Sequence, residues 1–159
     1  MVFFNILKSM IDFSNENVFF VSDTHFNHTK LCTGYEDHFE RTRKYETIEE
    51  MNEDIIDQWN KSITKDDVVI FLGDFSWGKP FNKIPYYAKY FYPKLNSKGI
   101  IWVEGNHDAI LRKSFNMIPY FEFKYNDKIY LCQHYGFDEK PELLIDHKAD
   151  YLVHRTHTL

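Results

Sequence analysis

The sequence predicts an α/β fold in a single domain, residues 1–159, whose later part turns antiparallel. Three observations support this prediction: short β-branched and aromatic runs alternate with helical patterns, a hairpin pattern follows them, and no Gly/Ser/Pro linker divides the chain. Apolar residues make up 43% of the chain and aromatic residues 18%, which is enough for a sizeable core and excludes intrinsic disorder. Residues 1–16 are expected to be an N-terminal extension.

Buried strands are predicted at residues 17–22, 67–72 and 99–103, because each run is β-branched or aromatic and is followed by polar residues. Between the first two strands, apolar residues recur at steps of three or four, which predicts an amphipathic helix. Its apolar face consists of Ile48, Met51, Ile55, Trp59 and Ile63. Thr47 and Glu50 have the spacing of a capping box, which marks the start of this helix.

A second helix is predicted over residues 82–92. Its aromatic residues suggest a platform for stacking bases or a core face, and their helical spacing favours the core for most of them: Tyr86, Tyr87, Tyr90, Phe91 and Tyr92. Further along, residues 120–125 and 128–132 flank Asn126 and Asp127, a pattern typical of a hairpin. Residues 151–154 are expected to form a last strand.

The sequence also indicates the cellular location of the protein. Its longest apolar runs, residues 18–21 and 68–72, are strand-sized, whereas a membrane span needs about 20 apolar residues. The N-terminus lacks the pattern of a secretory signal. Cys32 and Cys132 lie outside any CxxC motif, which suits a reducing compartment. We therefore expect a cytoplasmic protein without a membrane partner.

Residues able to bind metal ions follow the ends of the predicted strands. They are Asp23 and His25 after the first strand, Asp74 after the second, Asn106, His107 and Asp108 after the third, His134 after the hairpin, and His154 and His157 after the last strand. Loops that leave the carboxyl ends of strands converge at one edge of an open α/β sheet. We therefore expect these side chains to form one site.

These residue types suit a pair of divalent cations. Asp74 can bridge two ions, and imidazole with carboxylate or amide ligands favours Mn, Fe, Zn, Co or Ni over Ca. The net charge of −5 argues against binding nucleic acid through bulk phosphate neutralisation, whereas a cationic metal pair attracts phosphate locally. A hydroxide held by the metals would then attack phosphorus. His107 would protonate the leaving oxygen, and Asp108 would orient that histidine.

The strings SDTHF, LGDF and GNHD resemble those of the calcineurin-like metallophosphoesterase superfamily, especially its small stand-alone members from bacteria and phages. The likeness covers nearly the whole chain after residue 17. It implies an α/β/β/α sandwich of two mixed sheets with flanking helices. It also implies the following roles: Asp23, His25, Asp74 and His157 on metal 1; Asp74, Asn106, His134 and one further histidine on metal 2; and His107 as proton donor.

The chain departs from the family pattern in three ways. The usual closing Gly-His-x-His is replaced by residues 153–157, VHRTH, so that Arg155 stands where a metal 2 histidine is expected. Either His154 substitutes for that ligand, or Arg155 weakens the second site and itself binds phosphate. The chain is also C-terminally short, ending at Leu159. Trp77 stands where several branches carry Asp or Asn, and no GDxxDRG string is present, which disfavours the protein Ser/Thr phosphatase branch.

Two functions from different classes follow. The first is a cytoplasmic phosphohydrolase with two metal ions that cleaves a phosphomonoester or phosphodiester. A small nucleotide or cyclic nucleotide is favoured as substrate over long nucleic acid, because no basic track is visible near the site, and His28 is a further candidate substrate contact. A nuclease is kept as an alternative. The second is a degenerate relative that binds a nucleotide or protein without hydrolysis. The sequence leaves the oligomeric state open.

Overall fold

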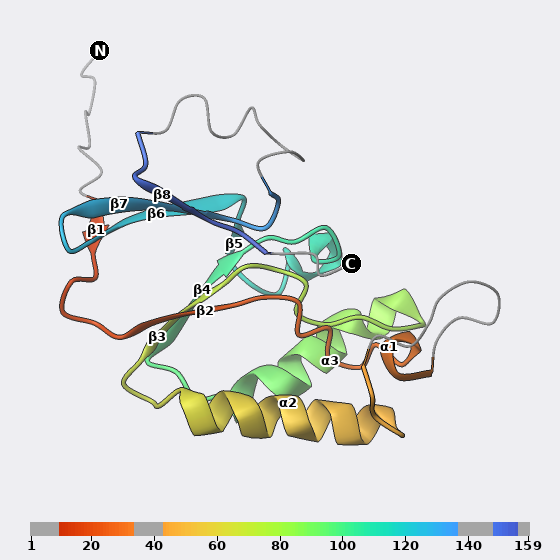
Figure 1. Cartoon of the computed structure of the whole chain (residues 1–159). Coiled ribbons are helices and arrows are strands. Elements are labelled where there is room, and N and C mark those ends of the chain that lie inside the picture. Colours follow the sequence, from red (N-terminus) through yellow and green to blue (C-terminus); the bar gives the residue numbers. More distant parts are fainter. Residues whose placement is uncertain (1–9, 34–42, 137–147, 156–159) are drawn as a thin grey trace, which may run out of the picture.

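The computed structural model describes residues 10–33, 43–136 and 148–155, which form two stacked sheets with helices on one side (Figure 1). The first sheet runs in the order β2, β3, β4, β5 and all its pairs are parallel. Its strands are β2 (Val18–Val21), β3 (Val68–Phe71), β4 (Gly99–Val103) and β5 (Met117–Ile118). Their carboxyl ends therefore point to the same edge of the sheet.

The second sheet is mixed and runs in the order β1, β6, β7, β8. Its strands are β1 (Ile11–Asp12), β6 (Tyr120–Tyr125), β7 (Lys128–Gln133) and β8 (Tyr151–Val153). β6 and β7 form the predicted hairpin, and Asn126 and Asp127 both have positive φ, as the tight turn between antiparallel strands requires. β7 and β8 are parallel, so His134 and His154 follow strand ends at the same side of this sheet.

Two long helices cover the outer face of the first sheet: α2 (Ile48–Ser62) and α3 (Ile84–Phe91). Thr47 caps α2, accepting a hydrogen bond from the Glu50 N–H at 3.1 Å, while the Glu50 carboxylate accepts from the Glu46 N–H at 2.9 Å. The shorter helical segments are α1 (Lys30–Thr33), η1 (Phe81–Lys83), η2 (Tyr92–Lys94) and η3 (Ala109–Leu111).

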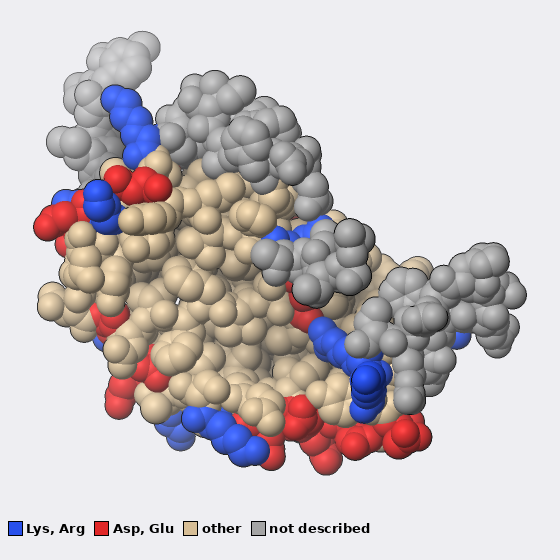
Figure 2. All heavy atoms as spheres, in the orientation of Figure 1, with Lys and Arg blue, Asp and Glu red and all other residues tan. Residues whose placement is uncertain are grey.

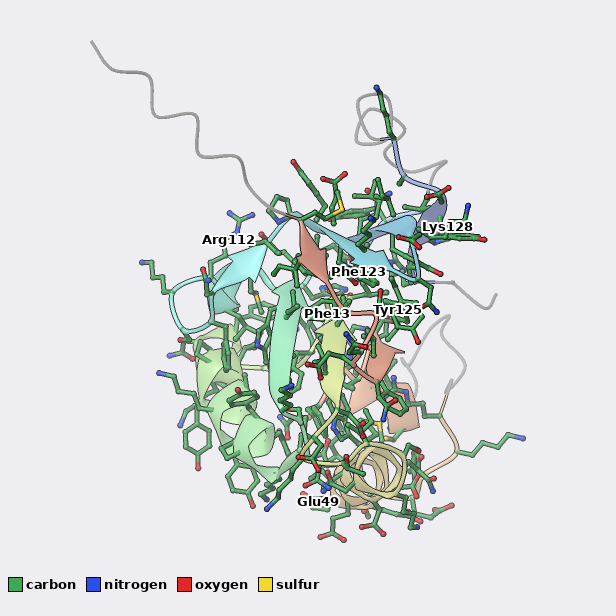
Figure 3. The ribbon with its side chains drawn as sticks, turned by 90° about the vertical axis from the view of Figure 1, so that its left-hand side faces the viewer. Phe13, Glu49, Arg112, Phe123, Tyr125 and Lys128 are labelled. Carbon is green, nitrogen blue, oxygen red and sulfur yellow. The ribbon has the colours of Figure 1, made fainter. Side chains whose placement is uncertain are left out.

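β3 is a fully buried strand, since all four of its residues are buried. Alternate side chains point to opposite faces of a strand, so β3 takes part in two cores. Val69 and Phe71 face the helices and pack with the residues of α2 and α3, whereas Val68 and Ile70 face the second sheet. Figure 3 shows Phe13 and Phe123 between the two sheets, where their ring centroids lie 5.4 Å apart. The two cores hold helices, first sheet and second sheet together as three layers.

The predicted α/β fold of two sheets with flanking helices is confirmed, and each predicted strand and helix is present. The two-residue strands β1 and β5 and the short helix α1 were not predicted. β1 lies within the expected N-terminal extension and pairs with β6. The expectation that most aromatic residues of the second helix are core is wrong: Phe91 is buried, but Tyr86, Tyr90 and Tyr92 are exposed.

Both cysteines are free and buried, and burial raises the pKa of Cys132 to about 12. Within the described ranges, none of the helices has the length and hydropathy that a membrane span requires.

We expect Thr47→Ala to lower the free energy of unfolding by about 1 kcal/mol, because the N–H of Glu50 loses its capping acceptor. Thr47→Ser keeps a hydroxyl at the same position and should stay close to the wild type. Urea titration followed by circular dichroism measures both variants. Equal stability of the Ala and Ser variants would contradict this role of the cap.

Candidate metal centre

The site is built where the loops after β2 and β3 run side by side. The Asp23 N–H donates to the Gly73 carbonyl at 2.9 Å, and the His25 N–H donates to the Asp74 carbonyl at 3.0 Å. Asp23, His25 and Asp74 all have positive φ, between 48° and 61°, a conformation that costs energy for residues with a Cβ. The inter-loop hydrogen bonds hold this strained backbone and bring the side chains of both loops to one edge of the sheet.

Carboxylate and imidazole groups converge at this edge. Asp23, Asp74 and His134 each offer one ligand atom, and these atoms all lie within 4.8 Å of one another. The Nε2 atom of His25 lies 3.5 Å from Asp23 Oδ1 and 3.7 Å from Asp74 Oδ2. Ligand atoms of one transition-metal ion lie roughly 3 to 3.5 Å apart, since each is about 2.1 Å from the ion. The observed separations are close to that range.

Asp74 lies between histidines from different parts of the chain. Its Oδ2 atom is 3.7 Å from Nε2 of His25 and 3.7 Å from Nε2 of His134, and its side chain is 3% exposed. A carboxylate with imidazoles on two sides is the arrangement that a bridging ligand needs. Burial raises the pKa of Asp23, but hydrogen bonds from His25 and Ser22 outweigh it, so that this pKa lies below its usual value. Asp23 is therefore an ionised acceptor at neutral pH.

The tautomer of His134 supports a cation at this position. Its Nδ1 lies 2.5 Å from the Leu72 carbonyl, which only accepts, so Nδ1 carries the hydrogen and Nε2 of the neutral ring carries a lone pair. Asn106 Oδ1 lies 2.9 Å from that Nε2. Two facing lone pairs repel, and a cation shared by both atoms, a proton on Nε2 or a turn of the Asn106 amide removes the repulsion. The donor set of Asp74, Asn106 and His134 thus fits a divalent cation.

Two glycines allow the loops to approach. A Cβ on Gly73 would lie against the backbone nitrogen of Gly105 and 2.7 Å from Nδ1 of His134, and Gly73 also has a φ of +92°. A Cβ on Gly105 would lie against the Asp74 carboxylate. A side chain at either position would therefore push the loops after β3 and β4 apart.

Asp108 joins these two loops. Its fully buried carboxylate accepts hydrogen bonds from the backbone N–H groups of Asp74 at 2.7 Å, Gly105 at 2.9 Å and Phe75 at 3.2 Å. Burial raises the pKa of Asp108, while the backbone hydrogen bonds act in the opposite direction. Among the described residues, its hydrogen bonds go to the backbone and none goes to the His107 ring. Asp108 is thus a positioning residue for the loops, in contrast to the expected role of orienting His107.

His107 lies at the rim of the site. Its Nε2 is 3.9 Å from Asp74 Oδ2, its side chain is 35% exposed, and its backbone N–H donates to Asp74 Oδ1 at 2.9 Å. The Trp77 ring packs edge-on against it, with 4.3 Å between the ring centroids. Burial lowers the pKa of His107, and nearby His25 and His134 lower it further against the attraction of Asp74. About a third of the His107 side chain is open to solvent at the rim of the candidate site.

His28 also faces this region, since its ring centroid lies 5.4 Å from that of His25 and 5.9 Å from that of Trp77. Burial and the neighbouring His25, His107 and Arg43 lower the pKa of His28 to about 4. His28 is therefore neutral at pH 7.

Arg43 is a site residue that sequence reasoning missed. The basic residues around it suggest a solvated loop, yet the half-buried guanidinium donates to the carbonyls of Asp23 at 2.5 Å and Thr24 at 2.7 Å. Arg43 thereby stabilises the strained backbone of the loop after β2. No signal in the sequence connects it with Asp23, since residues 34–42 separate it from α1 and its role depends on tertiary contacts.

The closing strand is described only in part. β8 pairs with β7 as far as Val153, which is level with Cys132, so both strands end near His134. The Nδ1 atom of His154 lies 2.5 Å from the Arg155 carbonyl, and Arg155 is buried. His157, the expected ligand of metal 1, lies outside the described residues.

The fold and the ligand cluster define an α/β sandwich with a candidate metal centre at its strand ends. A family model of calcineurin-like phosphoesterases matches residues 17–158, and the chain therefore belongs to the calcineurin-like phosphoesterase family. It is 35% identical over 115 residues to an uncharacterized protein of Methanocaldococcus jannaschii, MJ1445, in a match that covers 70% of this chain. The match spans 57% of that relative's own length.

A crystal structure of the protein of unknown function AQ665 from Aquifex aeolicus has the same fold. Its TM-score is 0.58 with 23% sequence identity, and the match covers 89% of this chain and 81% of the other. At this level of identity, the similarity concerns the fold alone.

We expect Asp108→Ala to lower the free energy of unfolding by about 3 kcal/mol or more, because three buried N–H groups lose their acceptor. Asp108→Asn keeps one oxygen and should fall between Ala and the wild type. Urea titration in EDTA measures this without any contribution from metal. Asp57→Ala, at a carboxylate that is 72% exposed on α2, is the control and should change stability by less than about 0.5 kcal/mol. Equal losses for Asp108→Ala and Asp57→Ala would contradict the assignment.

Proposed function

We propose that this chain hydrolyses a phosphomonoester or phosphodiester with two divalent cations held at the strand ends. Membership of the calcineurin-like phosphoesterase family implies metal-dependent phosphoester hydrolysis. The observation that supports the proposal is the convergence of Asp23, Asp74 and His134, whose ligand atoms all lie within 4.8 Å of one another with Asp74 available to both cations. Asp23, His25, Asp74 and His157 would hold one cation, and Asp74, Asn106, His134 and His154 the other. Mn, Fe, Zn and Ni suit this set of ligands.

Bound cations would supply a nucleophilic water at neutral pH and neutralise charge on the phosphate. The remaining steps belong to side chains of this chain. Asp23 and Asp74 bring only two negative charges to the ligand set, so the loaded site is cationic and attracts phosphate. His107 Nε2, at the exposed rim beside Asp74, is placed to give a proton to the leaving oxygen. Asp108 and Arg43 keep the loops in position through backbone hydrogen bonds.

The proposal includes a cytoplasmic location and a contact between Arg155 and the phosphate of the substrate. Arg155 stands in place of a metal 2 histidine and is buried, which favours a second candidate: a relative with a weakened second site that binds a phosphorylated ligand without hydrolysing it. The two functions differ in metal content and in turnover.

We expect Asp74→Asn to lower kcat/KM for bis(p-nitrophenyl) phosphate with Mn²⁺ by at least about 100-fold, because the group shared by both ions loses its charge. His107→Gln should lower kcat by roughly 100-fold or more while KM and metal content change little, as loss of a proton donor requires. Asp57→Asn, on the exposed face of α2, is the matched control and should retain wild-type rates. Metal-dependent turnover that survived Asp74→Asn would refute the proposed catalytic centre.

Equilibrium dialysis with Mn²⁺ should give two ions per wild-type chain. Asn106→Ala removes an exposed ligand of the second site only, and we expect it to weaken the second binding step by at least about tenfold while leaving the first unchanged. One ion or none per wild-type chain, together with no turnover on phosphoesters, would instead support the non-catalytic binding function.

A further inference from the structure

The charges of this acidic chain are unevenly distributed. Between Asp74 and Glu104 there are five lysines and no acidic residue, although the whole chain has 24 acidic residues against 19 basic ones. The lysines are Lys79, Lys83, Lys89, Lys94 and Lys98. This segment includes α3 and leads away from the metal centre. In contrast, Figure 2 shows acidic side chains gathered at one end of α2, the helix that packs beside α3 on the same sheet.

Exposed aromatic rings and lysines lie together along α3. Tyr86 and Tyr90 are four residues apart on this helix, Lys83 precedes it at the end of η1, and Lys94 follows it at the end of η2; we call these four residues the lysine–tyrosine stripe. Tyr86 is 64% exposed and Tyr90 is 51% exposed. The Lys94 ammonium lies 3.6 Å from the centroid of the Tyr90 ring, and the Lys83 ammonium lies 6.0 Å from that of Tyr86. Each ring is thus accessible and has a positive charge next to it.

The apolar core does not account for these tyrosines, because a different face of α3 packs against the sheet. Ile84, Ala88 and Phe91 form that buried face. Figure 3 shows α3 at the outside of the molecule beside α2, with side chains that project away from the protein.

Ring contacts connect the stripe to the metal centre. The Trp77 ring lies 4.3 Å from the His107 ring and 5.1 Å from the Phe81 ring, measured between centroids. Phe81 is 47% exposed and begins η1, and Lys83 ends it. Phe81 and Lys83 thus belong to one helical segment, which connects the start of the stripe through Trp77 to the rim at His107.

We propose that the lysine–tyrosine stripe binds single-stranded nucleic acid and directs one of its phosphodiester or terminal phosphate groups to the metal centre. The second half of this statement rests on the proposed function. Accessible rings with neighbouring cations match single strands, whose unpaired bases stack on aromatic side chains while lysines contact phosphates. The eight residues of α3 span about 12 Å, which corresponds to roughly three stacked nucleotides at 3.4 Å each.

This binding surface changes the expected substrate. The sequence favours a small nucleotide because no basic track is visible near the metal ligands. The folded chain has a basic and aromatic surface that the sequence did not reveal, since Lys83 and Lys94 lie beside the exposed rings of Tyr86 and Tyr90. In a duplex the base faces are stacked on one another and cannot stack on tyrosine rings, and an acidic peptide has no bases to stack. Weak binding of both ligands, compared with a single strand, would therefore distinguish base stacking from simple charge attraction.

Fluorescence anisotropy of a labelled oligothymidylate of about 12 nucleotides tests the stripe in EDTA, where hydrolysis does not interfere. We expect the double variant Tyr86→Ala/Tyr90→Ala to raise Kd by at least about tenfold, from the loss of base stacking. The double variant Lys83→Gln/Lys94→Gln should reduce the slope of log K against log salt by about 1.4, since each phosphate contact with a single strand contributes about 0.7.

Matched controls are Tyr151→Ala, at a 51% exposed tyrosine on β8, and Lys61→Gln, at a 67% exposed lysine on α2. Both should bind the oligonucleotide like the wild type. The proposal is overturned if the stripe variants bind as tightly as these controls, or if duplex DNA or polyglutamate binds as tightly as the single strand. A wild type that hydrolyses bis(p-nitrophenyl) phosphate but binds no oligonucleotide overturns the stripe alone. A wild type that binds the oligonucleotide without hydrolysing the ester supports the stripe and contradicts the proposed function.

Discussion

The candidate metal centre depends on one buried carboxylate. Asp108 accepts hydrogen bonds from backbone N–H groups on both sides of the gap between the loops after β3 and β4. The loop after β3 carries Asp74 and the loop after β4 carries Asn106, so this interaction sets the distance between ligands from two strands. Asp108 binds only backbone N–H groups in these contacts, so it does not occupy the side chains of Asp74 and Asn106. A carboxylate suits this position because it offers two acceptor oxygens to several converging donors.

The ligand set itself follows from the parallel sheet. β2, β3 and β4 are in register, with Val21 level with Phe71 and Phe71 level with Trp102. Their carboxyl ends are therefore level, and the first polar residues after each strand meet without any long loop. His134 comes from the second sheet, yet it reaches the same place because its Nδ1 binds the carbonyl of Leu72, directly after β3. The hydrogen bond between the sheets thus places the His134 imidazole at the candidate site.

Much of the fold could be predicted from the sequence because its main elements have strong periodic patterns. The α2 face of Met51, Ile55 and Trp59 and the apolar runs of β2, β3 and β4 are examples. The expectation that β2 is buried is wrong, because it lies at the edge of its sheet. β1 and β5 have two residues each, too few for a pattern, and they form through pairing with β6 and β4. Motif residues such as Asp23 and Asp74 were recognisable from local strings. Arg43 and the exposure of Tyr86 and Tyr90 were not, because both depend on which neighbours the folded chain brings close.

The approach of Gly73 and Gly105 has a consequence for homologous chains. Neither position has room for even a methyl group, and the space between them is also the space that Asp74 needs. A Cβ at either position would meet atoms of the neighbouring loop at less than 3 Å, so a larger residue requires that loop to shift. In any homologous chain with a larger residue at one of these positions, we therefore expect the loops after β3 and β4 to lie further apart and the carboxylate equivalent to Asp74 to be displaced.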